Sequence, residues 1–136
     1  MKWLVKEEPE TYGYNQFERD GKTVWAGVKN PLAQIHLRSI RKGDRVLYYH
    51  TGKEKAVIGE MEVVSDPQTD PTDLDPKAVA VRVKPVRRLQ HPVSLTRIKT
   101  DPQLADWDLV RLPRLSVLPV SAAQWKRVIE LGRDGE

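Results

Sequence analysis

Two runs rich in Val, Tyr and Ile, separated by a short turn, constrain the fold of this chain more than any other feature. The runs span 44–51 and 55–64, and Gly52-Lys53-Glu54 lies between them. β-branched and aromatic residues favour strands, and a glycine-containing turn of this length joins antiparallel neighbours. The sequence therefore predicts a β-hairpin in the middle of the chain.

Shorter strands are predicted on both sides of this hairpin. Val79, Val81 and Val83 occupy alternate positions and therefore share one face of a strand, with Arg82 and Lys84 on the other. Pro85 lacks the backbone N–H that a strand needs, so we expect it to interrupt this element. The other predicted strands span 2–6, 23–25 and 115–120.

Helix boundaries are marked by capping residues. Asn30 followed by Pro31 is typical of an N-cap and a first helical position, and Gly43 is the expected end of that helix. A capping box at 121–124 opens a terminal helix that we expect to end at Gly132. Further helical turns are predicted at 14–19, at 102–107 and after Ser94, whereas 66–76 is predicted to be a loop. Short strands interleaved with short helices indicate a mixed α/β fold, a small, partly closed β-barrel with helices at its rim.

Composition narrows the class of protein. A chain of 136 residues suits one domain, over residues 1–136, and the absence of cysteine excludes disulfides and thiolate metal sites. No apolar run approaches the length of a membrane span, so we expect a soluble, cytoplasmic protein without a membrane partner. The three histidines lack metal-ligand spacing, and phosphate-binding glycine loops and a Gly-x-Ser-x-Gly motif are absent. We therefore predict no metal, no cofactor and no catalysis.

Charge is segregated along the chain. The net charge is +4, and the stretch 77–100 holds seven Lys or Arg residues and no Asp or Glu, directly after the aspartate-rich 66–76. Such a stretch can hold a phosphate backbone, or it can be a solvated strand edge whose charges prevent aggregation. A second candidate phosphate site comprises Lys29, Arg38 and Arg41.

The run from Trp25 to Asn30 combines a large aromatic side chain, Gly27 and a side-chain amide. A base can stack on the tryptophan, the backbone can approach closely at the glycine, and the amide can read a polar edge. The alternative is structural: Trp25 belongs to the core, Gly27 to a turn, and Asn30 caps a helix.

Four blocks, in order, resemble those of EVE domains, a branch of the PUA-like fold related to the YTH readers of methylated RNA. They are WLVKEEPETYGYNQF, WAGVKNPLAQIHLRSIRKGDRVLYYHT, AVIGEMEVV and RLPRLSVLPVSAAQW. The family patterns are close to WLVKSEP, WDGVRNYQARN, GDxVFFYHS, VGxAEV and RLSVxPV. The resemblance implies a PUA-like barrel and a pocket that accepts a flipped, modified base, typically a cytosine modified at a ring carbon, in DNA.

Matching residue by residue, the resemblance implies a base pocket formed by Lys6, Glu8, Trp25, Gly27, Val28, Asn30, Tyr48, Tyr49, His50 and Ser116. The expected phosphate contacts are Arg82, Lys84, Arg87, Arg88 and Arg114. Four residues depart from the pattern: Glu7 replaces serine, Ala26 an acidic residue, Gln34 arginine and His36 asparagine.

Two alternative functions stay open at this point. PUA-like domains often bind RNA, so the partner can be modified tRNA or rRNA rather than modified DNA. The other alternative is an enzyme that acts on modified nucleotides, with Glu8 or His50 as the acid–base group. A requirement for the 2′-hydroxyl separates RNA from DNA binding, and turnover of a modified nucleoside identifies an enzyme.

Overall fold

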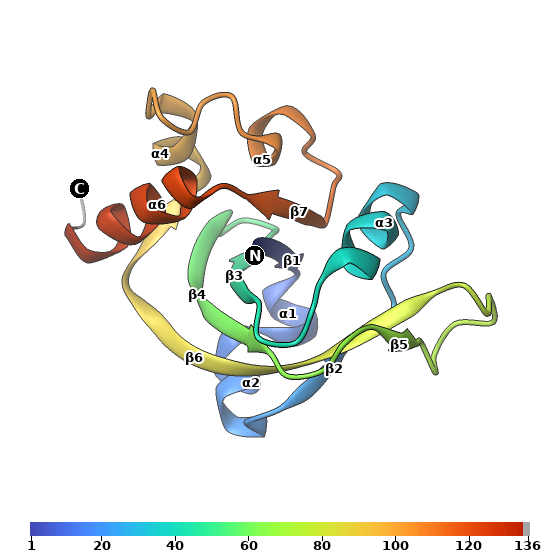
Figure 1. Cartoon of the computed structure of the whole chain (residues 1–136). Helices are drawn as coiled ribbons and strands as arrows, with labels where there is room; N and C mark the ends of the chain where they lie inside the picture. Colours follow the sequence, from blue (N-terminus) through green and yellow to red (C-terminus); the bar gives the residue numbers. More distant parts are fainter. Residues whose placement is uncertain (135–136) are drawn as a thin grey trace.

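A strongly curved, seven-stranded sheet organises the chain in the computed structural model, which describes residues 1–134. The strand order is β2-β6-β4-β3-β1-β7, and β5 pairs with the outer part of β6. Within residues 1–134, the β1–β3 pair is parallel and all other strand pairs are antiparallel. Figure 1 shows the sheet curling into a half-barrel with β6 wrapped around its outside. The strands are β1 (Lys2–Glu7), β2 (Thr23–Trp25), β3 (Arg45–His50), β4 (Ala56–Val63), β5 (Gln68–Thr69), β6 (Val79–Ser94) and β7 (Val117–Val120).

The predicted hairpin is confirmed as the antiparallel pair β3–β4. The prediction that Pro85 interrupts its strand is wrong, because β6 continues through Pro85 to Ser94. Met61 pairs with Pro85 and Glu60 with Arg87, so Val86 is an extra residue in β6. This β-bulge accommodates the missing N–H of proline without ending the strand. The loop predicted over 66–76 also contains the short strand β5.

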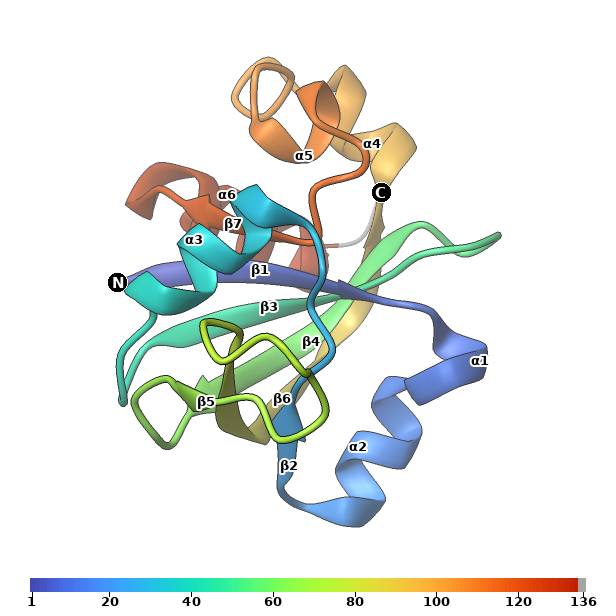
Figure 2. The same ribbon diagram turned by 90° about the vertical axis from the view of Figure 1, so that its right-hand side faces the viewer.

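The helices are short and lie at the rim of the sheet. Figure 2 shows α4 and α5 at one end of the molecule and α1 with α2 at the other. None of the helices in residues 1–134 is long and apolar enough to cross a membrane. The helices are α1 (Pro9–Tyr12), α2 (Tyr14–Asp20), α3 (Pro31–Ser39), α4 (Leu95–Thr100), α5 (Asp108–Arg111) and α6 (Ala122–Asp134).

Helix starts were predicted better than helix ends. The caps at Asn30 and Ser94 are confirmed, since each side chain accepts a hydrogen bond from an N–H in the first turn. The helix α3 ends before Gly43, which instead lies in the turn into β3 with φ +94°. Gly132 does not end α6 but lies within it, where a Cβ would come within 3.0 Å of Leu89. This glycine allows α6 to approach β6 closely. The segment 102–107 consists of turns, and α5 begins after it.

An aromatic cluster fills the centre of the half-barrel. Tyr14, Phe17 and Tyr48 are fully buried, and the rings of Tyr14 and Phe17 lie 5.2 Å and 5.5 Å from that of Tyr48. The Tyr14 hydroxyl lies 2.7 Å from the carbonyl of Glu60 and 2.9 Å from that of Arg87. It therefore joins β4 to β6 where their pairing is irregular, and it fixes α2 under the sheet.

Candidate functional site

Trp25, the last residue of β2, belongs partly to the core and partly to the surface. It is 6% exposed, and its ring meets Tyr48 edge-on at 5.3 Å. The indole N–H of Trp3 donates to Asp44, and that of Trp107 to the carbonyl of Pro119. The indole N–H of Trp25 has no acceptor within residues 1–134. Every fully buried side-chain nitrogen or oxygen in that range has a partner, so the N–H of Trp25 must reach the surface. It is a free donor at the edge of an aromatic core.

The loop after Trp25 is held by a buried carboxylate from the aspartate-rich segment. Gly27, with φ +75°, donates its N–H to Asp70 Oδ2 at 2.8 Å. Asp70 is 1% exposed, and its other oxygen accepts from the N–H and the hydroxyl of Thr72. Burial raises the pKa of Asp70, but these hydrogen bonds outweigh it and hold the pKa below its ordinary value of 3.8. The N–H of Gly27 therefore already has an acceptor, and the role of this glycine is to shape the loop.

Gln34, one of the departures from the family pattern, has a structural role in this loop. The residue is 6% exposed, and its side-chain amide donates to the carbonyl of Val28 at 2.7 Å. Its side-chain oxygen accepts from the N–H of Val79 at 3.1 Å. The side chain thus ties the loop and α3 to β6. Asn30, at the end of the loop, accepts from the N–H of Ala33 at 3.0 Å, as its capping role predicts.

A pocket of about 320 Å³ opens beside Asn30, and we call it the Asn30 pocket. Its volume lies within the usual range for small-molecule sites. Its other walls come from the start of α3 and from the segment between α5 and β7. The lining residues are Asn30, Leu32, Arg111, Leu112, Pro113, Arg114 and Leu115. Of the predicted site residues, this pocket brings together Asn30 and Arg114.

Lys6 and Ser116 connect the Asn30 pocket to the sheet. The ammonium group of Lys6 donates to the carbonyl of Pro113 at 2.9 Å and lies 5.7 Å from the centre of the Tyr49 ring. The N–H of Lys6 donates to the carbonyl of Ser116 at 2.9 Å. Burial lowers the pKa of Lys6 and raises the pKa of Tyr49 to about 12. These contacts anchor the 111–116 segment to the end of β1.

The predicted pocket residues occupy both faces of the sheet. Lys6 pairs with Tyr49, whereas the neighbouring pairs are Val5 with Tyr48 and Glu7 with His50. Successive side chains along a strand point to opposite faces. Lys6 and Tyr49 therefore share one face, and Tyr48 and His50 share the other with Trp25. Glu7, a departure from the family serine, lies on the Trp25 face, and burial raises its pKa.

The two candidate acid–base residues are both engaged in structural hydrogen bonds. His50 Nε2 accepts from the N–H of Tyr14 at 3.1 Å, and Nδ1 lies 2.8 Å from a carboxylate oxygen of Glu54. This arrangement requires a neutral ring that carries its proton on Nδ1. Glu8 accepts from the hydroxyl of Thr51 at 3.1 Å. Both residues thus hold the loop that joins β3 to β4 against the start of α1 and α2.

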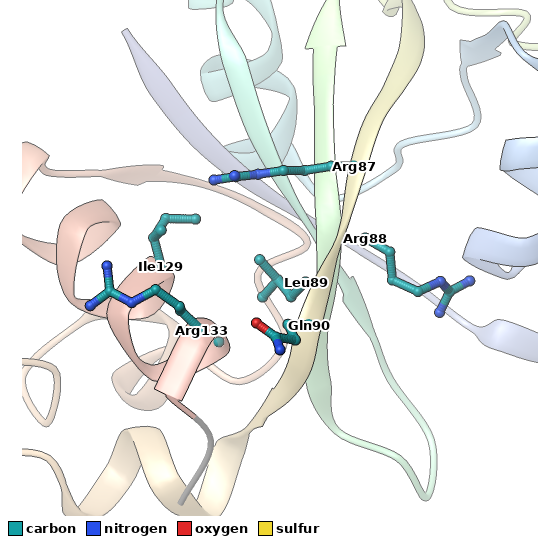
Figure 3. Close-up of a pocket in the computed structure, with 7 residues that line it drawn as sticks. Arg87, Arg88, Leu89, Gln90, Ile129 and Arg133 are labelled. Atoms are coloured by element: carbon teal, nitrogen blue, oxygen red, sulfur yellow. The ribbon is translucent and has the colours of Figure 1, made fainter.

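Arg87 and Arg88 do not meet the Asn30 pocket. They line a different pocket of about 260 Å³ between β6 and α6, with Gln90 and Arg133 among its walls (Figure 3). Figure 3 shows Arg88 pointing away from the side on which Arg87 and Arg133 lie. The Nε of Arg87 contacts Glu60 at 2.7 Å, and Arg88 contacts Glu18 at 3.0 Å. These two guanidinium groups are already neutralised by carboxylates.

The other predicted phosphate contacts differ in whether their charged groups already have a partner. Lys84 lies 3.7 Å from a carboxylate oxygen of Glu62. The guanidinium of Arg82 has no partner within residues 1–134, and the residue pairs with Val24 of the edge strand β2. Arg114 is likewise unpaired in that range, and so is its neighbour Arg111. Free guanidinium groups thus occur within the acid-free stretch, at Arg82, and outside it, at Arg111 and Arg114.

Comparison with known proteins decides the family. The model of the EVE domain matches residues 1–131. The chain belongs to the EVE domain family. A Rhodopseudomonas palustris protein solved by NMR is 40% identical, with a TM-score of 0.91 over 96% of this chain and 92% of that one. Thymocyte nuclear protein 1 of Rattus norvegicus is 28% identical over 95% of this chain and 72% of its own length.

One solved relative was crystallised with a ligand. The human THYN1 protein, in complex with DNA that contains 5-methylcytosine, is 25% identical to this EVE domain. It superposes with a TM-score of 0.89 over 99% of both chains. The mixed α/β half-barrel with short helices is thus shared with that structure.

Sequence reasoning missed five residues of the Asn30 pocket: Leu32, Arg111, Leu112, Pro113 and Leu115. The available signal was the pattern Arg-Leu-Pro-Arg, in which two arginines flank an apolar pair before a strand. It also missed Asp70, whose carboxylate contacts a loop 43 residues earlier in the chain. The roles assigned to the individual pocket residues stay predictions.

Proposed function

We propose that this EVE domain binds DNA containing a modified cytosine and receives the modified base, flipped out of its stack, between the 25–30 loop and the 111–116 segment. The Asn30 pocket is the observation that carries the proposal. It combines apolar walls, a side-chain amide and two unpaired guanidinium groups at one opening. Apolar walls suit the faces of a base, the amide suits its polar edge, and the arginines suit the flanking phosphates.

The kind of ligand is supported by the human relative that was crystallised with 5-methylcytosine DNA. Apolar contact with a C5 methyl group is one way in which proteins recognise a methylated pyrimidine. In this chain Leu32 and Leu115 supply apolar surface to the pocket. A cytosine carrying a small apolar group on its ring suits this pocket better than an unmodified one.

Trp25 does not line the Asn30 pocket, and beside the 25–30 loop it offers a hydrogen-bond donor rather than a large stacking surface. Its 6% exposure leaves only an edge of the indole accessible, and its free N–H lies on that edge. The acceptor is a carbonyl or ring nitrogen of the base, or a phosphate oxygen. Asp70 and Gln34 keep the loop after Trp25 in place before the ligand arrives. A preformed loop lowers the entropic cost of binding.

Fluorescence anisotropy with short labelled oligonucleotides tests the proposal. We expect tighter binding to a duplex with one 5-methylcytosine than to the unmodified duplex of the same sequence. The same methylated sequence made as RNA shows whether a 2′-hydroxyl is required. Equal affinity for methylated and unmodified DNA would contradict the proposed specificity.

Two substitutions separate the possible roles of Trp25. Trp25→Phe keeps an aromatic ring but removes the N–H, whereas Trp25→Ala removes both. If the N–H is the contact, both variants lose affinity for methylated DNA by about tenfold, a typical value for one hydrogen bond to a charged or buried partner. If Trp25→Phe binds like the wild type and Trp25→Ala does not, the ring provides stacking instead. Thermal unfolding of both variants checks that the core is intact.

A further inference from the structure

An exposed apolar tip projects between two unpaired arginines at the mouth of the Asn30 pocket. Leu112 is 40% exposed, and Pro113 beside it is also exposed. Arg111 and Arg114 flank this pair in the sequence, and neither guanidinium group has an ion-pair or hydrogen-bond partner within residues 1–134. Leu32, on the opposite wall, is 41% exposed. A large apolar side chain is thus held in water where the surrounding charge favours a polyanion.

Hydrogen bonds fix the backbone conformation of the tip. The N–H of Leu112 donates to the carbonyl of Asp108 at 2.8 Å, and the N–H of Leu115 donates to the carbonyl of Leu112 at 3.0 Å. The second bond closes a four-residue turn in which Pro113, with its fixed φ, occupies the favoured second position. Lys6 donates to the carbonyl of Pro113 and attaches this turn to β1. Three hydrogen bonds and a proline therefore hold Leu112 outward at a defined place.

We propose that Leu112 is a wedge that enters the base stack of duplex DNA and fills the space left by the flipped base, while Arg111 and Arg114 bind the phosphates on either side. This inference rests on the proposed function. A flipped base leaves an unstacked gap whose formation costs a few kcal/mol, and apolar side chains are used elsewhere to fill such gaps. Leu112 lies at the mouth of the pocket that receives the base. A single docking of the protein on the duplex therefore brings the base to the pocket and Leu112 to the gap.

The partner class follows from charge and shape together. A protein partner would bury Leu112 but would leave two unpaired arginines to be matched by acidic residues. Duplex DNA supplies the phosphates on both sides of a base step and an apolar gap between them. A single strand has no stacked partner strand whose gap must be filled. The wedge therefore distinguishes duplex from single-stranded DNA.

Leu112→Ala tests this role with two forms of one oligonucleotide. The methylated strand is offered alone and paired with its complement, and affinities are measured by anisotropy. We expect the variant to lose about tenfold in affinity for the duplex and less than about twofold for the single strand, because only the duplex requires the gap to be filled. Leu112→Phe, with a larger apolar side chain, is expected to retain duplex binding.

Val86→Ala is the matched control. Val86 is 39% exposed, like Leu112, but lies in the bulge of β6 and lines neither of the two pockets described above. It is expected to bind both forms like the wild type.

A second readout is the fluorescence of 2-aminopurine placed next to the methylated base, which rises on unstacking. We expect this rise with wild-type protein and a smaller one with Leu112→Ala.

Three other results would contradict the proposal that Leu112 fills the gap left by the base. Equal loss of affinity for duplex and single strand would make Leu112 a pocket wall that contacts the base itself. Unchanged affinity for the duplex would leave Leu112 without a role in binding, while the proposed function stands. Failure of the wild-type protein to prefer methylated DNA in either form would overturn the proposed function, and the wedge with it.

Discussion

Glu7 brings a carboxyl group into the half-buried space beside Tyr48 and His50. Burial raises its pKa above the ordinary value of 4.5, and the charge of Glu8 adds to this, while the N–H of Glu8 and the nearby His50 oppose it. The folded protein therefore holds this proton more tightly than the unfolded chain does. Between pH 4.5 and the folded pKa, the free energy of unfolding contributed by Glu7 falls as the pH rises.

Glu7→Gln removes this titration but keeps an oxygen that accepts from the N–H of Glu8. We expect the variant to gain stability relative to the wild type as the pH rises through that window, and to show no further relative gain above it. Urea unfolding of both proteins from about pH 4 to about pH 7 measures the difference. Glu10→Gln, at an exposed glutamate in α1, is the control. A difference that does not change with pH would show that Glu7 is not held in a desolvated position.

At the scale of elements, the aspartate-rich loop acts as a clamp on the 25–30 loop through Asp70. Asp70→Ala leaves the N–H of Gly27 and both donors of Thr72 without their acceptor. Buried donors without partners cost about 1–3 kcal/mol in stability. We expect a loss of this size in chemical denaturation, and weaker binding of methylated DNA because Trp25 and Asn30 are no longer held.

Asp75→Ala, in the same loop, is the control for Asp70. Asp75 is exposed, and within residues 1–134 its side chain accepts only from the N–H of Lys77. Its removal should leave both stability and DNA binding near the wild-type values. If Asp70→Ala proves as stable as Asp75→Ala, the clamp does not contribute to the fold, and the order of the 25–30 loop must come from Gln34 instead.

What the sequence could predict depended on the range of the interaction. The β3–β4 hairpin and the caps at Asn30 and Ser94 follow from neighbouring residues, and they were predicted correctly. Pro85 was misjudged because local rules do not show that the partner strand accepts a bulge. The family resemblance assigned Asn30 to the base pocket and Arg114 to the phosphate contacts, but it did not show that they line one pocket with Arg111 and Leu112.

The charge pattern also shows that sequence reasoning misses contacts between residues far apart in the chain. The acid-free stretch 77–100 suggested a row of free basic groups. In the fold, Arg87 meets Glu60, 27 residues away, and Arg88 meets Glu18, 70 residues away. A count of charges along the chain does not include partners brought in by other strands and helices. Which arginines are free is therefore a tertiary property, and here Arg111 and Arg114 are among them.

At the scale of the whole molecule, this distribution of paired and free arginines predicts how salt affects DNA binding. Each phosphate neutralised on a duplex contributes about −0.9 to the slope of log Kobs against log salt. Arg111→Ala combined with Arg114→Ala removes two free cations at the Asn30 pocket, so the slope should become shallower by roughly 0.9 for each phosphate that the variant no longer neutralises. Arg87→Gln combined with Arg88→Gln keeps donors for Glu60 and Glu18 and should leave the slope unchanged. Titrations of a methylated duplex at several salt concentrations measure both slopes. A shallower slope for the Arg87 and Arg88 pair alone would show that these ion pairs open on binding and that the DNA backbone follows β6, and it would remove the electrostatic argument for a duplex centred on Leu112.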